Sequence, residues 1–302
     1  MIGLVALAAA FAAAPPQTVL TIDPKHRLVE GVASDGKTIF VSSILDRQVL
    51  ACTKTCTTFA TLPDPLYPFA IAWDGLRQRL WVAADCPPGV SAIKPCERGA
   101  LIALDTKGRI QTRISPTIGQ FHPGDVSASR GEVFVSDSQN GMVFRLTKNE
   151  RGIMAVVLPD VGKSAQGTAL SANGSELLVA DYSQGIATVD LKTFKRTLLA
   201  RQDGKPLRGI DGLVRCGSTY YGIYNGAAPG LLVSITHTDK GIEFSQPLGE
   251  TTLPDPTQVT YDGKRLLIVA DSGWASVDKP EVPRSSGTPI IAVPLSGDCK
   301  PR

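Results

Sequence analysis

The sequence lacks several features that would place it in a simple class. Its most apolar stretch, residues 2–14, has thirteen residues, whereas a membrane-spanning helix needs about 20. No long basic run is present, and 31 Lys and Arg nearly balance 28 Asp and Glu, which argues against a nucleic-acid partner. With 302 residues, 43% of them hydrophobic, the chain is neither disordered nor too short to bury a large core.

The short motifs of several enzyme classes are also missing. The sequence contains no G-x-S-x-G nucleophile elbow, no H-E-x-x-H zinc motif and no G-x-x-x-x-G-K-[ST] phosphate loop. Only three histidines are present. Any catalytic site must therefore be sought in the arrangement of the fold, because no local signature gives it.

Residues 1–14 predict a cleaved signal peptide. The stretch is apolar and uncharged, ends in small residues, and contains Ala10-Phe11-Ala12, which fits an A-x-A cleavage site. The alternative is an apolar disordered tail. We expect a secreted or periplasmic protein, in which residues 15–302 form a single domain and no other segment spans a membrane.

Six cysteines fit an exported protein with three disulfides. Cys52 and Cys56 are close enough in sequence to staple a hairpin, Cys86 and Cys96 enclose a Pro-rich loop, and Cys216 and Cys299 remain. Six cysteines allow 15 pairings, so proximity only ranks them. A zinc site would require Cys-x-x-Cys or neighbouring histidines, and the sequence contains neither.

A repeated phrase dominates the chain: an apolar strand, a tight turn, then a second apolar strand that ends in a small residue and often Asp. The second strands begin near Thr38, Arg79, Glu132, Glu176, Thr219 and Arg265. The central valines Val41, Val82, Val135 and Val179 are 41, 53 and 44 residues apart. Units of four strands at such a period predict a six-bladed β-propeller, an all-β fold.

The turns and the chain ends support this architecture. Gly-containing turns such as Asp35-Gly36 and Asp262-Gly263 join the first two strands of each unit, as expected for hairpins. The last unit lacks a fourth strand, which Thr18–Ile22 would supply to close the ring and protect its edges. The alternative, two β-sandwich domains, leaves the six copies unexplained.

In a propeller, the segments that open each first strand meet at one mouth of the central pore. Glu30, Asp125, Gln166, Asp211 and Gln258 are therefore expected to converge there. A ring of carboxylate and amide oxygens suits a hard divalent cation, with calcium the best fit, and such a metal could polarise an ester carbonyl. Alternatively, these groups bond only to strand ends and pore water.

Further polar residues lie at the same mouth. Asp85, Asp137, Asp181, Asn225 and Asp271 end the second strands, and we expect most of them to cap their own turns. His122 precedes the pore segment of the third unit and is the candidate general base, although it could equally be a solvated loop histidine. Trp274, in a long insertion, either packs over a ligand or pins its loop.

The chain resembles the senescence marker protein/gluconolactonase family of TolB-like six-bladed propellers. The resemblance rests on Glu30-Gly31, Pro123-Gly124-Asp125, Gln166–Gly174 and Ile210-Asp211-Gly212 at the openings of four units, and it covers the whole chain after residue 14. It implies hydrolysis of lactones or related esters with a divalent cation held by a Glu, two Asn and an Asp.

Carried over by position, Glu30 and Asp211 match the family's Glu and Asp. One Asn falls on Gly124, which has no side chain, and the other falls on Gln166, which is longer by one methylene. The expected metal ligands are thus Glu30, Gln166 and Asp211, with Asp125 able to turn inward, and His122 or bound water is the base.

Two functions follow from these observations. The first is a metal-dependent lactone or ester hydrolase, and the second is a non-catalytic propeller that binds a small molecule or a protein segment at the same face. Retention of Glu30 and Asp211 favours the first, whereas loss of the Asn pair favours the second. We expect a monomer.

Overall fold

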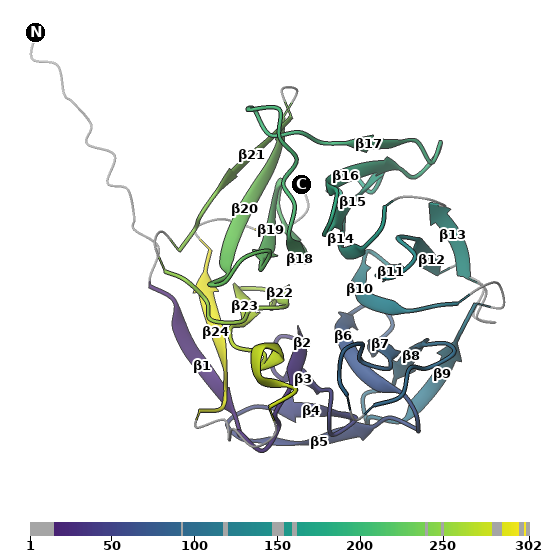
Figure 1. The fold of residues 1–302 in the computed structure, drawn as a ribbon, viewed down its shortest axis with the longest axis vertical. Coiled ribbons are helices and arrows are strands. Elements are labelled where there is room, and N and C mark those ends of the chain that lie inside the picture. Colours follow the sequence, from purple (N-terminus) through teal and green to yellow (C-terminus); the bar gives the residue numbers. More distant parts are fainter. Residues whose placement is uncertain are drawn as a thin grey trace, which may run out of the picture.

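Six small sheets are arranged in a ring around a central axis (Figure 1). The computed structural model describes residues 15–91, 93–116, 120–146, 154–158, 162–238, 241–248, 251–279, 286–295 and 299, with the backbone alone described for 154–158. Each sheet has four antiparallel strands, and the predicted six-bladed propeller is confirmed. The predicted signal peptide, residues 1–14, lies outside the described residues.

Blades 1 to 3 follow one another along the chain, each running outward from the axis. Blade 1 consists of β2 (Val29–Ser34), β3 (Ile39–Ser43), β4 (Gln48–Cys52) and β5 (Cys56–Thr61). Blade 2 consists of β6 (Tyr67–Asp74), β7 (Arg79–Asp85), β8 (Ala100–Leu104) and β9 (Ile110–Ile114). Blade 3 consists of β10 (Pro123–Ser129), β11 (Glu132–Asp137), β12 (Val143–Leu146) and β13 (Met154–Leu158).

Blades 4 to 6 complete the ring. Blade 4 consists of β14 (Ala165–Leu170), β15 (Glu176–Asp181), β16 (Gly185–Asp190) and β17 (Arg196–Leu198). Blade 5 consists of β18 (Ile210–Cys216), β19 (Thr219–Tyr224), β20 (Leu231–Thr238) and β21 (Gly241–Ser245). Blade 6 consists of β22 (Val259–Tyr261), β23 (Arg265–Val269), β24 (Thr288–Pro294) and β1 (Gln17–Ile22).

The N-terminal strand closes the ring as predicted. β1 pairs antiparallel with β24, so that the last blade combines the two ends of the described chain. Its inner side packs into a cluster that also contains Val29, Val41 and Leu267, which joins blade 6 to blade 1. β1 thereby covers the outer edge of β24, and closure of the ring protects that edge from pairing with another chain.

The second strands of the blades are buried on both sides, which explains their unbroken apolar runs. β7 and β15 are buried along nearly their whole length, because each blade packs face to face against its two neighbours. At the hairpins between first and second strands, Gly36 and Gly263 have φ values of 89° and 96°, which only glycine adopts readily.

Five of the six innermost strands carry a β-bulge where they begin. The register shifts between Val29 and Val32, Pro68 and Ile71, Pro123 and Asp125, Ala165 and Thr168, and Ile210 and Leu213. A bulge adds one residue opposite its partner strand and redirects the local side chains. Glu30, Gln166 and Asp211 all lie within these bulges, so a repeated backbone irregularity presents them at one mouth of the pore.

A glycine follows each of these three residues because the neighbouring blade leaves no room for a side chain. A Cβ at Gly31 would lie 2.6 Å from the carbonyl oxygen of Phe69, and one at Gly167 would lie 2.5 Å from that of Asp211. The pairs Glu-Gly, Gln-Gly and Asp-Gly in the sequence thus mark the bulges and the close contact between blades.

Three disulfides join the cysteine pairs that the spacing favours: Cys52–Cys56, Cys86–Cys96 and Cys216–Cys299. Such bonds are typical of proteins from an oxidising compartment. Helix is confined to one short 3-10 turn, η1 (Trp274–Ser276), within the described residues. In that part of the chain, no helix has the length and apolar character needed to cross a bilayer.

Candidate functional site

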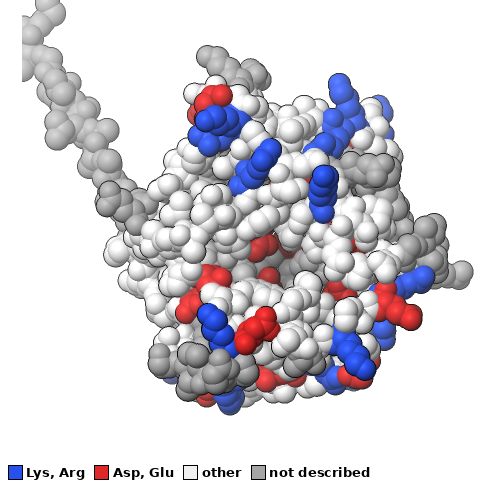
Figure 2. All heavy atoms as spheres, viewed as in Figure 1, with Lys and Arg blue, Asp and Glu red and all other residues white. Residues whose placement is uncertain are grey.

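A cavity of about 340 Å³ lies at the mouth of the pore where the inner strands begin. Its wall includes Glu30, Asp85, Gln166, Tyr182, Asp211 and Trp274. In the same view as Figure 1, acidic atoms lie within the hollow at the centre of the ring and basic side chains lie around it (Figure 2). Among the described residues that line the cavity there is no lysine or arginine, so it favours cationic or neutral ligands over anions.

Trp274 holds the carboxylate of Glu30. The indole Nε1 donates a hydrogen bond of 2.5 Å to Glu30 Oε2, and the ring lies against Phe69 with centroids 6.5 Å apart. Enclosure within the ring, followed by the charge of nearby Asp211, raises the pKa of Glu30 well above its ordinary value. Trp274 thus contacts blades 1 and 2 from its loop and also lines the cavity, where packing over a ligand stays a prediction.

The turn that carries Trp274 is fixed by Asp255. Its Oδ2 accepts hydrogen bonds from Ser272 Oγ at 2.7 Å and from the Gly273 amide at 3.0 Å. The 3-10 turn begins directly after these residues. The position of the indole over the cavity is thus set by hydrogen bonds that anchor its own loop.

Asp211 accepts a hydrogen bond from Asn225, which directly follows the next strand of the same blade, β19. Asn225 Nδ2 donates to Asp211 Oδ2 at 2.9 Å and to the Pro256 carbonyl at 2.9 Å, whereas Asn225 Oδ1 is buried without a partner among the described residues. Enclosure raises the pKa of Asp211 to about 7. A cation near this carboxylate would remove the cost of ionising it.

Asp125 lies deeper than the sequence suggested and is not among the residues that line the cavity. Its Oδ1 accepts hydrogen bonds from Gln258 Nε2 at 2.8 Å and from the Val126 amide at 2.6 Å. Burial, followed by the charge of Asp211, raises the pKa of Asp125 to about 7. The structure thus brings Asp125 close to the other acids but binds it to the opposite blade.

Gln166 offers an amide oxygen beside Gly124. Its Nε2 donates to Ser164 Oγ at 3.2 Å, and its Oε1 lies 3.2 Å from where a Cβ on Gly124 would stand. The orientation of this amide leaves the oxygen directed toward Gly124. Gln166 therefore offers one neutral oxygen ligand, as expected from the sequence.

The donor set fits a hard cation in its chemistry, since it combines the carboxylate oxygens of Glu30 and Asp211 with the amide oxygen of Gln166. No group of three or more His, Cys, Asp or Glu side chains that could hold a metal ion is found in the described parts of the chain. Any metal at this mouth would therefore depend on neutral oxygens such as that of Gln166 in addition to Glu30 and Asp211.

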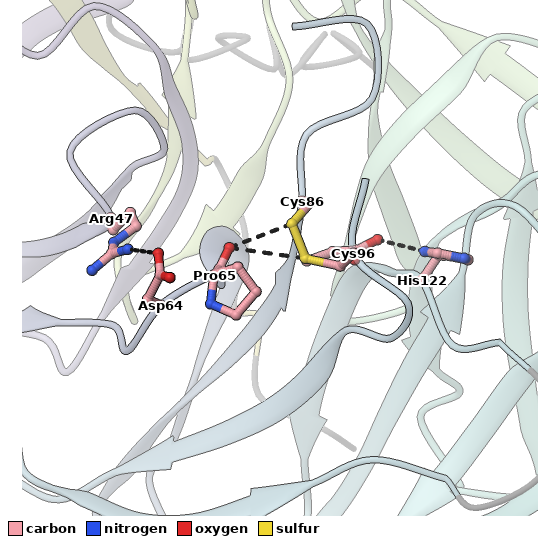
Figure 3. The surroundings of a disulfide bond; sticks show 7 residues. Arg47, Asp64, Pro65, Cys86, Cys96 and His122 are labelled. Atoms are coloured by element: carbon pink, nitrogen blue, oxygen red, sulfur yellow. Dashed lines mark hydrogen bonds and ion pairs between the residues drawn. A yellow bond between two sulfur atoms is a disulfide. The ribbon is translucent and has the colours of Figure 1, made fainter. Parts of the chain in front are cut away.

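His122 lies behind a carboxylate of the cavity wall. Its Nδ1 is 2.9 Å from Asp85 Oδ2, and the side chains of the two residues are 9% and 6% exposed. Asp85 lines the cavity, whereas His122 is not among the lining residues. Figure 3 shows His122 beside the Cys86–Cys96 disulfide, with this hydrogen bond as a dashed line.

Asp85 lines the cavity, although sequence reasoning expected it only to cap its own turn. Asp137 and Asp181, at the same place in other blades, accept hydrogen bonds from the amides of Asn140 and Gln184 in their own turns, as expected for caps. Asp85 departs from this pattern because a long loop follows it. That loop, and a histidine one blade further on, are the only signals in the sequence that could have distinguished Asp85.

Comparisons with known proteins were informative only at the level of structure. No family model matches the sequence, and no curated protein is similar enough in sequence to match. A gluconolactonase from Xanthomonas campestris superposes with a TM-score of 0.64 at 17% identity, over 95% of this chain and 92% of the other. The calcium-binding protein regucalcin from Agrobacterium tumefaciens gives 0.65 at 15% identity, over 94% and 97%.

Proteins with other chemistry share the same architecture. An aldose sugar dehydrogenase from Streptomyces coelicolor, in its PQQ-bound form, gives a TM-score of 0.63 at 10% identity, over 92% of this chain and 97% of the other. The resemblance to gluconolactonase-like propellers is therefore confirmed for the fold. Function must be argued from the site itself, because one fold hosts many activities.

Proposed function

We propose that this protein hydrolyses a lactone or related small ester at the pore mouth with the help of a divalent cation. The observation that carries the proposal is the grouping of Glu30, Asp211 and Asp125. Burial raises the pKa of all three, and no Lys or Arg is among the described residues that line the cavity. Carboxylates brought together without a compensating charge favour a bound cation or bound protons.

Glu30, Gln166 and Asp211 would hold the cation, and calcium is the best match to oxygen ligands of this kind. The metal would supply a positive charge that polarises a carbonyl oxygen. Trp274 keeps Glu30 in place, and Asn225 keeps Asp211 in place. The likeness to a gluconolactonase and to a calcium-binding regucalcin supports this assignment.

The walls of the cavity favour a small organic substrate. Its volume of about 340 Å³ is at the lower end of the range of about 300–1,000 Å³ for small-molecule sites. Phe69, Tyr182 and Trp274 provide flat apolar surface, and Ser164 and Gln139 add polar groups. This combination suits a ring-shaped ester that carries hydroxyl groups.

The test is hydrolysis of a panel of lactones, including glucono-lactone, and of simple esters, with calcium, manganese or a chelator. Glu30→Gln and Asp211→Asn should each abolish the metal-dependent rate while the fold remains intact. Asp203→Asn is the matched control, since this exposed acid pairs with Arg201 on the outer edge of blade 5. Full activity of either cavity variant would refute the proposal.

The non-catalytic alternative rests on one specific observation. Gly124 contributes no oxygen where the family has an asparagine, and Ser138 Cβ lies 2.9 Å from the position of a Cβ at that site. A protein that binds a ligand without turnover would bind cations or lactones in calorimetry yet release no acid.

We propose export with removal of residues 1–14, which N-terminal sequencing of the mature protein would test.

A further inference from the structure

Asp85 lines the cavity and has one buried carboxylate oxygen without a partner. It ends β7, its side chain is only 6% exposed, and Oδ1 is buried without a hydrogen-bond partner among the described residues. An unpaired oxygen of this kind is costly to bury. We infer that Asp85 is the catalytic proton acceptor of this site and that His122 is a positioning residue that acts through it.

His122 is well suited to orient Asp85. Its backbone amide donates to Asp137 Oδ2 at 3.1 Å, and its carbonyl accepts from the Ser138 amide at 3.1 Å. The ring nitrogen Nδ1 is thereby held 2.9 Å from Asp85 Oδ2. This contact occupies Oδ2 and leaves Oδ1 without a hydrogen-bond partner among the described residues.

The backbone on the other side of Asp85 is also fixed. Cys86 follows directly and is joined to Cys96 across the loop, and the sulfur of Cys86 lies 3.4 Å from the Pro65 carbonyl oxygen (Figure 3). The carboxylate is therefore set by a disulfide on its own blade and by a histidine from blade 3. Such support on two sides is what precise placement of a reacting group requires.

This inference rests on the proposed hydrolysis and assigns its proton transfer. A water molecule beside Asp85 Oδ1 gives a proton to that oxygen while its own oxygen bonds to the carbonyl carbon of the lactone. The ring C–O bond then breaks, the proton passes from Asp85 to the departing oxygen, and the open hydroxy acid is released. Burial raises the pKa of Asp85, which makes its carboxylate a stronger base.

The charged groups that face Asp85 are His122 and Asp137. Both come from blade 3, and Asp137 is itself occupied by amides of its own turn. His122 is thus the polar side chain through which the basicity of Asp85 can be tuned. Removing it should displace the acidic limb of the pH profile, which a purely structural role would leave in place.

The decisive experiment uses the full chain, glucono-lactone and calcium. Asp85→Asn should lower kcat by about 100-fold to 10,000-fold, as expected for loss of a general base, and should leave calcium affinity in calorimetry unchanged. His122→Gln should lower kcat more than it changes KM and should shift the pH profile. Asp46→Asn is the matched control, because Asp46 forms the same kind of contact with His26 but does not line the cavity.

Each outcome decides the matter. If Asp85→Asn keeps the wild-type kcat, the inference is wrong but the proposed function stands. If a folded Asp85→Asn loses calcium binding, the inference is also wrong, since Asp85 would then be a metal ligand. A wild type that hydrolyses no substrate would overturn the proposed function and this inference together. If Asp85→Asn does not fold, Asp85→Glu should lower kcat, and unchanged kcat would again refute the inference.

Discussion

Gln258 donates a hydrogen bond to Asp125 across the ring, from blade 6 to the opposite blade 3, over 2.8 Å. Along the inner strands, the residues before this hydrogen bond line the acidic cavity. The residues after it, such as Val32, Ser127 and Thr260, line a second hollow of about 220 Å³. The contact thus lies between the two hollows and ties together opposite sides of the ring.

Replacing Asp125 with Asn should stabilise the metal-free protein at pH 8. Because the pKa of folded Asp125 is raised to about 7, from about 4 in an unfolded chain, its stabilising contribution is present at low pH and is lost as the pH rises through 7. The amide carries no charge and still accepts from Gln258. Thermal melts with a chelator should show a gain of several degrees at pH 8 and little change at pH 4. A lower melting temperature at pH 8 would contradict the argument.

Trp274→Phe should weaken cation binding, most clearly at pH 6. The phenyl ring can still pack on Phe69, but the hydrogen bond to Glu30 Oε2 is lost, so the pKa of Glu30 should rise further and protons should compete more strongly with the metal. Calcium calorimetry at pH 6 and pH 8 measures this difference. Trp73→Phe is the control, since Trp73 stacks on Phe40 and faces the other hollow. If Trp274→Phe bound calcium as tightly as the wild type at both pH values, the proposed role of Trp274 would be wrong.

A second neutral oxygen ligand can be introduced at Gly124. Because a Cβ there would lie 2.9 Å from Ser138 Cβ, Gly124→Asn should be accommodated best together with Ser138→Gly. The double variant should bind calcium about tenfold more tightly than Ser138→Gly alone, because one more hard oxygen faces the cation. Identical affinities in the two proteins would show that position 124 does not face the metal.

The disulfide between blade 5 and the C-terminal residues should matter more for stability than the hairpin disulfide. Cys216 and Cys299 are 83 residues apart, whereas Cys52 and Cys56 are four apart. Loop entropy gives about 4.5 kcal/mol for the first and about 2 kcal/mol for the second. Urea unfolding of the two double Ala variants should therefore give the larger loss for Cys216 and Cys299, and the reverse order would refute this explanation.

The sequence predicts the fold well because its signal is repeated. Strands such as Arg79–Asp85 and Glu176–Asp181 alternate with glycine turns at similar spacing, and the strand that closes the ring was expected at Thr18–Ile22 and is found at Gln17–Ile22. Each copy independently supports the same architecture. Local chemistry and global topology therefore agree along the chain.

The site is harder to predict because it depends on contacts between distant residues. Sequence reasoning placed Glu30, Gln166 and Asp211 at one pore mouth, and all three line one cavity. It could not show that Asp125 is bonded to Gln258, 133 residues away, or that Asp85 contacts His122, 37 residues away. These contacts arise from β-bulges and a loop conformation that no short motif encodes.

Titration of the protein with calcium and manganese by calorimetry tests the central claim most directly. The account predicts binding at a single site that releases protons below pH 8, because the raised pKa values of Glu30 and Asp211 must fall when a cation binds. Glu30→Gln and Asp211→Asn should each abolish this binding. Absence of binding at millimolar metal, or binding that persists in both variants, would contradict the account.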